Sequence, residues 1–162
     1  MRRAAASVCL ITLFALIAAP GAMTHPAARG RVALTSREAS LIVAINAVRT
    51  LHLLPTLRFD SRLTRAARSH SRDMLRHQYF AHGDFGARMA QFRVRGRLFA
   101  ENLVWSSGVM SANAAVAQWL ASPPHRANLL DPELRRVGVG TPVGAFAGFS
   151  TATVVTADFA GG

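Results

Sequence analysis

The chain contains one cysteine, Cys9, so no disulfide can form within it and an apolar core must hold the fold together. Cys9 lies in an uncharged run from Ala4 to Ala19 that follows two arginines. This pattern is typical of a secretory signal peptide, and the run is shorter than the roughly 20 residues that span a bilayer as a helix. We therefore expect residues 1–22 to be cleaved, leaving no stable transmembrane segment and an extracellular or cell-envelope protein.

Cleavage would leave a chain without thiols, which excludes thiol catalysis and zinc ligated by cysteine. A length of 162 residues with 51% hydrophobic and 17% charged residues fits one globular domain and excludes a disordered tail. Residues 23–34, which include Pro26 and Gly30, are predicted to form a flexible leader. Residues 35–161 are then the predicted domain.

The formal net charge is +11, and every basic residue is an arginine. Outside a cell, such a protein meets anionic lipid head groups and acidic envelope polymers, so we expect no nucleic-acid partner. A solvated basic face that keeps a monomer soluble is the alternative interpretation.

Helical periodicity dominates the first half of the domain. Thr35 and Glu38 have the spacing of a capping box, and apolar residues then recur at helical intervals. A second predicted helix, capped by Asp60 or Ser61, ends before Tyr79.

The second half of the domain is predicted to contain strands as well as helices. We expect an irregular segment over residues 81–96, a helix from Ser111 to the prolines at 123 and 124, and a helical turn over 125–130. Strands are predicted over 136–140 and 149–159, joined by a Gly/Pro turn region. Helices followed by strands indicate an α+β fold.

Four ordered motifs carry a family resemblance. They are Tyr79-Phe80-Ala81-His82, Ala100-Glu101-Asn102-Leu103, the stretch from Trp119 to Leu130 with its run from Pro124 to Leu130, and Arg136-Val137-Gly138-Val139-Gly140. Together they resemble the CAP superfamily, which includes cysteine-rich secretory proteins, insect venom antigens and plant pathogenesis-related proteins, and specifically its short bacterial members with few cysteines. This resemblance implies a three-layer α-β-α sandwich.

The resemblance also implies a cleft lined by two histidines and two acids that can hold a divalent cation. His82, Glu101 and His125 match three of these positions, and two imidazoles with one carboxylate suit zinc while leaving a position open for water. The family's second acid is missing after Trp119, and Asp84 is either its substitute or a turn cap.

The same residues also allow a purely structural interpretation. His82, Glu101 and His125 would then form a buried hydrogen-bond network in which Asn102 and Asn128 satisfy backbone groups. His70 and His77 lie on a helical stripe with apolar residues, so we expect them to be packed or half-exposed rather than metal ligands.

Two catalytic look-alikes are set aside. Ser150 lies in a partial nucleophile-elbow sequence followed by β-formers, so we expect it to be a strand residue. Gly138 and Gly140 have the spacing of a dinucleotide loop, but no helix follows them.

Family members are linked to lipid and sterol binding, to extracellular signalling or defence, and in some cases to proteolysis. We expect a non-catalytic binding module whose His/Glu-lined cleft engages a lipid, sterol, anionic cell-envelope polymer or host ligand. The alternative is a metal-dependent hydrolase in which His82, His125 and Glu101 hold zinc and a water. In a third interpretation these residues only stabilise the fold.

Overall fold

The computed structural model describes residues 32–162. The predicted signal peptide and most of the predicted leader lie outside these described residues. Within residues 32–162, no helix combines the length and the apolar character needed to cross a membrane.

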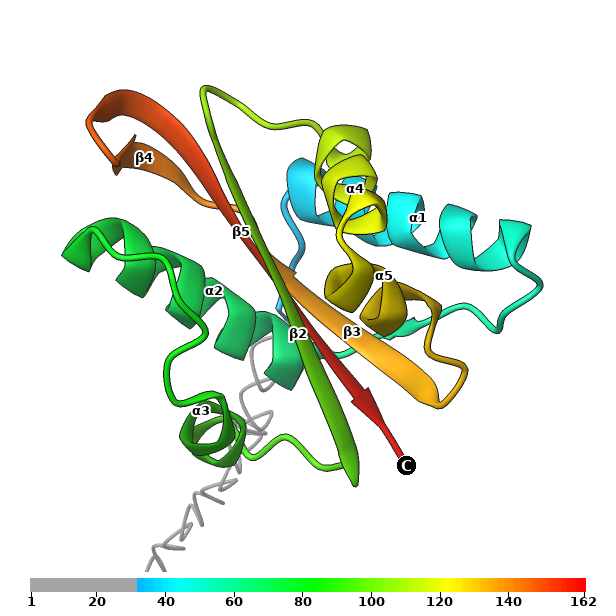
Figure 1. The fold of residues 1–162 in the computed structure, drawn as a ribbon. Helices are drawn as coiled ribbons and strands as arrows, with labels where there is room; N and C mark the ends of the chain where they lie inside the picture. The colour runs from blue at the N-terminus through cyan, green and yellow to red at the C-terminus, as the bar shows by residue number, and fades with distance from the viewer. Residues whose placement is uncertain (1–31) are drawn as a thin grey trace, which may run out of the picture. The chain divides into compact units, whose positions relative to one another are not determined.

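A mixed sheet forms the middle layer of the domain (Figure 1). Its strand order is β1-β3-β5-β2, with β4 also paired to β5. The strands are β1 (Arg58–Phe59), β2 (Leu98–Ser107), β3 (Leu134–Gly140), β4 (Val143–Phe146) and β5 (Phe149–Gly161). Only β1 and β3 pair in parallel, while β5 is antiparallel to β2, β3 and β4.

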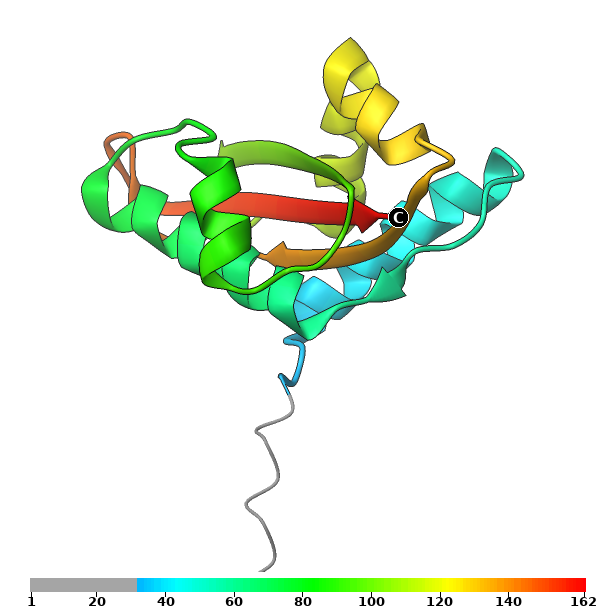
Figure 2. The same ribbon diagram turned by 90° about the horizontal axis from the view of Figure 1, so that it is seen from below.

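Helices cover both faces of this sheet. One face carries α1 (Ser36–Leu51), α4 (Ala112–Ala121) and α5 (Pro123–Leu130), and the other carries α2 (Ser61–His77) and α3 (Phe85–Gln91) (Figures 1 and 2). The expected α+β fold and its three-layer α-β-α arrangement are therefore confirmed.

Alternation along the strands divides the core between the two faces. Phe159 packs with α1, α4 and α5 around the fully buried Trp119, whereas Leu103 packs with Met74 of α2. Glu101 lies two residues before Leu103, so the pleat places it on the side of the sheet that α2 and α3 cover.

The predicted helix starts are confirmed. The Thr35 hydroxyl accepts a hydrogen bond from the Glu38 amide at 3.3 Å, and the Thr35 amide donates to Glu38 Oε2 at 2.8 Å. Of the two predicted caps, Asp60 caps α2, which ends at His77 and therefore before Tyr79 as predicted. The Ser111 hydroxyl caps α4.

Three local predictions need correction. The segment 81–96 is not wholly irregular, because Asp84 accepts a hydrogen bond from the Ala87 amide at 2.8 Å and starts α3. The expected Gly/Pro turn region contains β4, which forms a hairpin with β5. The helical turn predicted over 125–130 is part of a helix that starts at Pro123, where proline is compatible with the first turn.

Candidate functional site

Glu101 lies at the centre of the predicted site, and both of its carboxylate oxygens are engaged. Oε1 is 2.6 Å from Nδ1 of His82, and Oε2 accepts a hydrogen bond from Nη2 of Arg88. Nε2 of His70 lies 3.8 Å from the same Oε2. The Glu101 side chain is 2% exposed, so this carboxylate faces protein groups rather than solvent.

The two predicted histidines come from elements on opposite faces of the sheet, and of the two only His82 contacts the Glu101 carboxylate. His82 lies in the connection between α2 and α3, and its side chain is 57% exposed. His125 lies in the first turn of α5, where burial, and secondarily the charge of nearby His82, lowers the pKa of its imidazole. His125 also lines a shallow groove along β2 together with Phe80 and Trp105.

The two asparagines tie α5 to the strand that carries Glu101. Nδ2 of Asn102 donates to the His125 carbonyl at 2.9 Å. Nδ2 of Asn128 donates to Oδ1 of Asn102 at 2.9 Å and to the Glu101 carbonyl at 3.3 Å. These bonds position the start of α5, and with it His125, against β2.

Two residues of this cluster, Arg88 and Asp158, were not recognised in the sequence, and a third, His70, was expected only to pack or to be half-exposed. Arg88 comes from α3 and His70 from α2, while Asp158 lies directly opposite Glu101 in the β2–β5 register. Asp158 is completely buried; its burial, followed by the charge of Glu101, raises the pKa of its carboxyl well above the usual value. Asp158 is the one acidic residue of β5, and this is the sequence signal that could have identified it.

The structure therefore places a second carboxyl group, that of Asp158, beside Glu101. It does not come from the segment after Trp119, where the family's second acid was expected. Asp84, the candidate substitute, instead caps α3. Buried His70 packs on α2 as expected, and its pKa is lowered, chiefly because burial disfavours the imidazolium.

The donor set does not match a three-ligand zinc centre. Within residues 32–162, no three His, Cys, Asp or Glu side chains are grouped so that they could hold one metal ion. Glu101 is already bound by His82 and Arg88, which leaves two imidazoles. Zinc binding by His82, His125 and Glu101 stays a prediction, and no chemical step is assigned to a metal.

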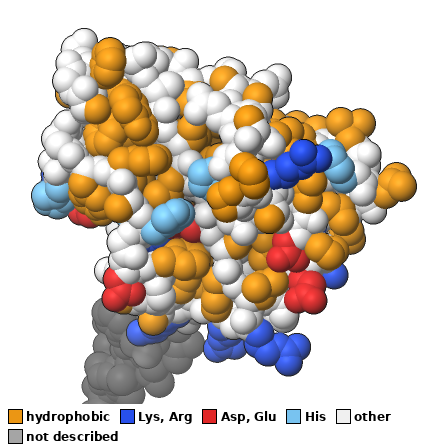
Figure 3. Space-filling view, viewed as in Figure 1, with side chains coloured by type: hydrophobic (Ala, Val, Ile, Leu, Met, Phe, Trp, Pro, Cys, Tyr) orange, Lys and Arg blue, Asp and Glu red, His pale blue; other side chains and the backbone are white. Residues whose placement is uncertain are grey.

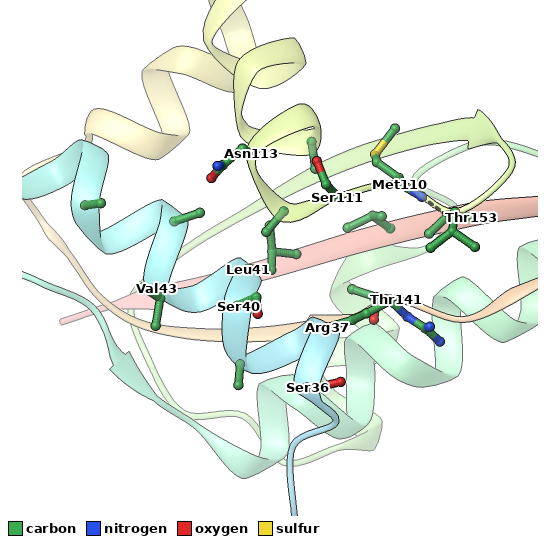
Figure 4. A pocket seen from close by; sticks show the side chains of 17 residues that line it. Ser36, Arg37, Ser40, Leu41, Val43, Met110, Ser111, Asn113, Thr141 and Thr153 are labelled. Atoms are coloured by element: carbon green, nitrogen blue, oxygen red, sulfur yellow. Dashed lines mark hydrogen bonds between the residues drawn. The ribbon is translucent and has the colours of Figure 1, made fainter.

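A larger cavity lies elsewhere, between α1 and α4, and it was not anticipated from the sequence. Its volume is about 740 Å³. Leu41 and Val43 of α1 and Met110 before α4 contribute apolar surface, while Thr153 of β5 lies at its inner side (Figure 4). We call this cavity the α1–α4 groove.

Polar side chains from both helices also line the α1–α4 groove. Ser36, Arg37 and Ser40 lie on α1, and Ser111 and Asn113 lie at the start of α4 (Figure 4). The groove thus combines an apolar interior with one cationic side chain at its rim. Such a cavity is chemically suited to an amphiphile.

Comparison with known proteins identifies the family. The family model described as "Cysteine-rich secretory protein family" (CAP) matches residues 42–159. The chain belongs to this family, and the resemblance carried by the four sequence motifs is confirmed.

Two relatives come from Bacillus subtilis (strain 168). The chain is 31% identical over 111 residues to the uncharacterized membrane protein YlbC, covering 65% of this chain and 32% of that protein. It is 30% identical over 112 residues to the uncharacterized protein YkwD, covering 66% and 43%. The chain thus spans less than half of each of these relatives.

A solved structure shares the fold. It is an extracellular protein containing an SCP domain from Bacillus anthracis str. Ames, with a TM-score of 0.64 and 27% identity. The match covers 78% of this chain and 40% of that one. The shared region is therefore the CAP domain, which makes up less than half of the Bacillus anthracis protein.

Proposed function

We propose that this protein is a non-catalytic binding module of the CAP family that holds an amphiphile with an apolar chain in the α1–α4 groove. The observation that carries this proposal is the cavity of about 740 Å³. That volume lies within the roughly 300–1,000 Å³ typical of small-molecule sites. Leu41, Val43 and Val155 supply apolar surface for such a chain.

The groove is a better binding site than the His/Glu-lined cleft expected from the sequence. Glu101 has little exposed surface, and its oxygens are held by His82 and Arg88, so a ligand would have to break an existing ion pair. Breaking a buried pair leaves an uncompensated charge and is costly. An apolar chain entering the groove breaks no such interaction.

The rim indicates which end of the ligand faces outward. Arg37 is exposed and forms no ion pair with any acid in residues 32–162. A carboxylate or phosphate at the end of an acyl chain would pair with this guanidinium. We therefore favour anionic lipids over neutral sterols as ligands.

We also propose that the protein acts outside the cytoplasm. The extracellular Bacillus anthracis neighbour and the sequence pattern of residues 1–22 support this location. The hydrolase alternative receives no support from the cluster geometry, because Glu101 is not free to act as a general base.

The test is equilibrium binding of a long-chain fatty acid that carries an environment-sensitive fluorophore. Ser40→Trp and Ala47→Trp each place an indole in the groove from exposed positions on α1. Each should weaken binding by about tenfold or more, because several methylene contacts worth about 0.8 kcal/mol each are lost.

Ser69→Trp is the matched control, since Ser69 is exposed on α2 and does not line the groove. His82→Ala and His125→Ala should leave fatty-acid binding unchanged. Loss of binding in the histidine variants, with none in the groove variants, would move the site to the cleft and refute the proposal.

A further inference from the structure

Arginines converge at the end of the sheet where β1 and β2 begin. The parallel β1–β3 register pairs Arg58 with Arg136. Nη1 of Arg62 donates to the Arg93 carbonyl at 2.9 Å, and Nη2 of Arg136 donates to the Arg95 carbonyl. We define the arginine end as Arg58, Arg62, Arg93, Arg95, Arg97 and Arg136.

The fold exposes this charge rather than neutralising it. Arg93, Arg95 and Arg97 are exposed in the connection from α3 to β2, and none forms an ion pair with an acid among residues 32–162. Figure 3 shows basic side chains gathered at the lower end of the described domain, over this connection. Two acids lie nearby: Asp60 pairs with Arg136 at 2.6 Å, and Glu133 is exposed just before β3.

Apolar surface adjoins the same arginines. A second cavity of about 510 Å³ lies between α3 and the start of β2, and Phe85, Met89, Val94 and Phe99 line it together with Arg95. Phe59, next to Arg58, is 42% exposed. A wholly polar polymer would leave this apolar surface unused, whereas a bilayer interface offers both anionic groups and hydrocarbon.

We propose that the arginine end is a docking surface for a membrane that contains anionic phospholipids. The exposed guanidiniums bind lipid phosphates, and the neighbouring apolar side chains face the upper part of the acyl region. This inference does not depend on the α1–α4 groove, whose lining residues are different.

The experiment measures sedimentation of the purified protein, recovered after export, with vesicles of equal parts phosphatidylglycerol and phosphatidylcholine. Binding should be lost on pure phosphatidylcholine vesicles and should weaken as salt is raised, because screening shortens the reach of the charges. A basic residue near an anionic leaflet contributes about fivefold in affinity. The triple variant Arg93→Gln, Arg95→Gln, Arg97→Gln should therefore bind about 100-fold more weakly.

The matched control removes the same charge from another surface. Arg65, Arg72 and Arg76 are exposed on α2 and form no described ion pair. The triple variant Arg65→Gln, Arg72→Gln, Arg76→Gln should retain most of the vesicle binding. Equal losses in both triple variants would mean that net charge alone attracts the protein, which would overturn the proposal.

Two further outcomes separate this proposal from its alternatives. Failure of the folded wild-type protein to bind the mixed vesicles, or binding only to a soluble polyphosphate, would also overturn the membrane assignment. The groove variant Ser40→Trp should bind vesicles like the wild type, so failure of the fatty-acid proposal and failure of the docking proposal are distinguishable.

Discussion

The environment of Asp158 makes the stability of the fold depend on pH. Its side chain is completely buried, and neither carboxyl oxygen has a hydrogen-bond partner within the described residues. Burial and the adjacent Glu101 raise its pKa well above 3.8, although Arg88 opposes this effect. The neutral acid is therefore the form that this environment favours.

We predict that Asp158→Asn reduces the loss of stability with rising pH. Above about pH 4 the unfolded chain releases the Asp158 proton while the native protein keeps it, so the native state binds more protons and the free energy of unfolding falls. The limiting slope is about 1.4 kcal/mol per pH unit for one proton. Denaturant unfolding of both proteins between pH 4 and pH 8 measures the difference.

Other groups change the free energy of unfolding in the opposite direction between pH 4 and pH 8. Burial lowers the pKa of both His70 and His125, so the unfolded chain binds more protons there and stability rises with pH. The wild type and Asp158→Asn share this histidine contribution, so it cancels when their stability curves are subtracted. Parallel stability curves for wild type and Asp158→Asn would contradict the account of Asp158.

The close packing of α2 on β3 explains the glycines of the Arg136–Gly140 motif. A Cβ atom at Gly138 would lie 2.1 Å from the Thr64 amide nitrogen, and one at Gly140 would lie 2.7 Å from the Ala67 carbonyl oxygen. Both obstacles are helix backbone, which cannot rotate away as a side chain can. The glycine pair serves helix–sheet contact, not a dinucleotide.

We predict that Gly138→Ala lowers the free energy of unfolding by about 3 kcal/mol or more, because α2 must move away from the sheet. Thermal unfolding followed by circular dichroism measures the loss. Gly144→Ala is the control, since its Cβ would meet only the Leu75 side chain at 3.6 Å, an ordinary contact. Similar melting temperatures for the two variants would refute the packing argument.

Across the whole domain, features that depend on neighbouring residues were predicted from the sequence better than features that depend on residues far apart in the chain. Thr35, Asp60 and Ser111 each mark a helix start through a hydrogen bond within the next three residues. The predictions for Thr35 and Ser111 hold, and of the two predicted caps Asp60 and Ser61 the structure has Asp60. The four motifs of the CAP family then indicated the sandwich. β2 and β4 went unrecognised because their existence depends on pairing with β5, far away in the chain.

The same distinction applies to the candidate sites. Motif matching found His82 and Glu101, which do meet at 2.6 Å. It did not find Arg88 or Asp158, because a helix turn and a strand register bring them to Glu101. The α1–α4 groove was missed for the same reason, since its walls come from separate elements.

The central claim is that an apolar chain occupies the α1–α4 groove, and photocrosslinking tests it most directly. A fatty acid with a diazirine in its chain would be irradiated with the protein and the labelled peptides identified by mass spectrometry. We predict labels on α1 and on the segment from Val109 to Ala115, which line the groove. Labels confined to the Phe80–His82 segment and α5, around the His/Glu cluster, would contradict the account.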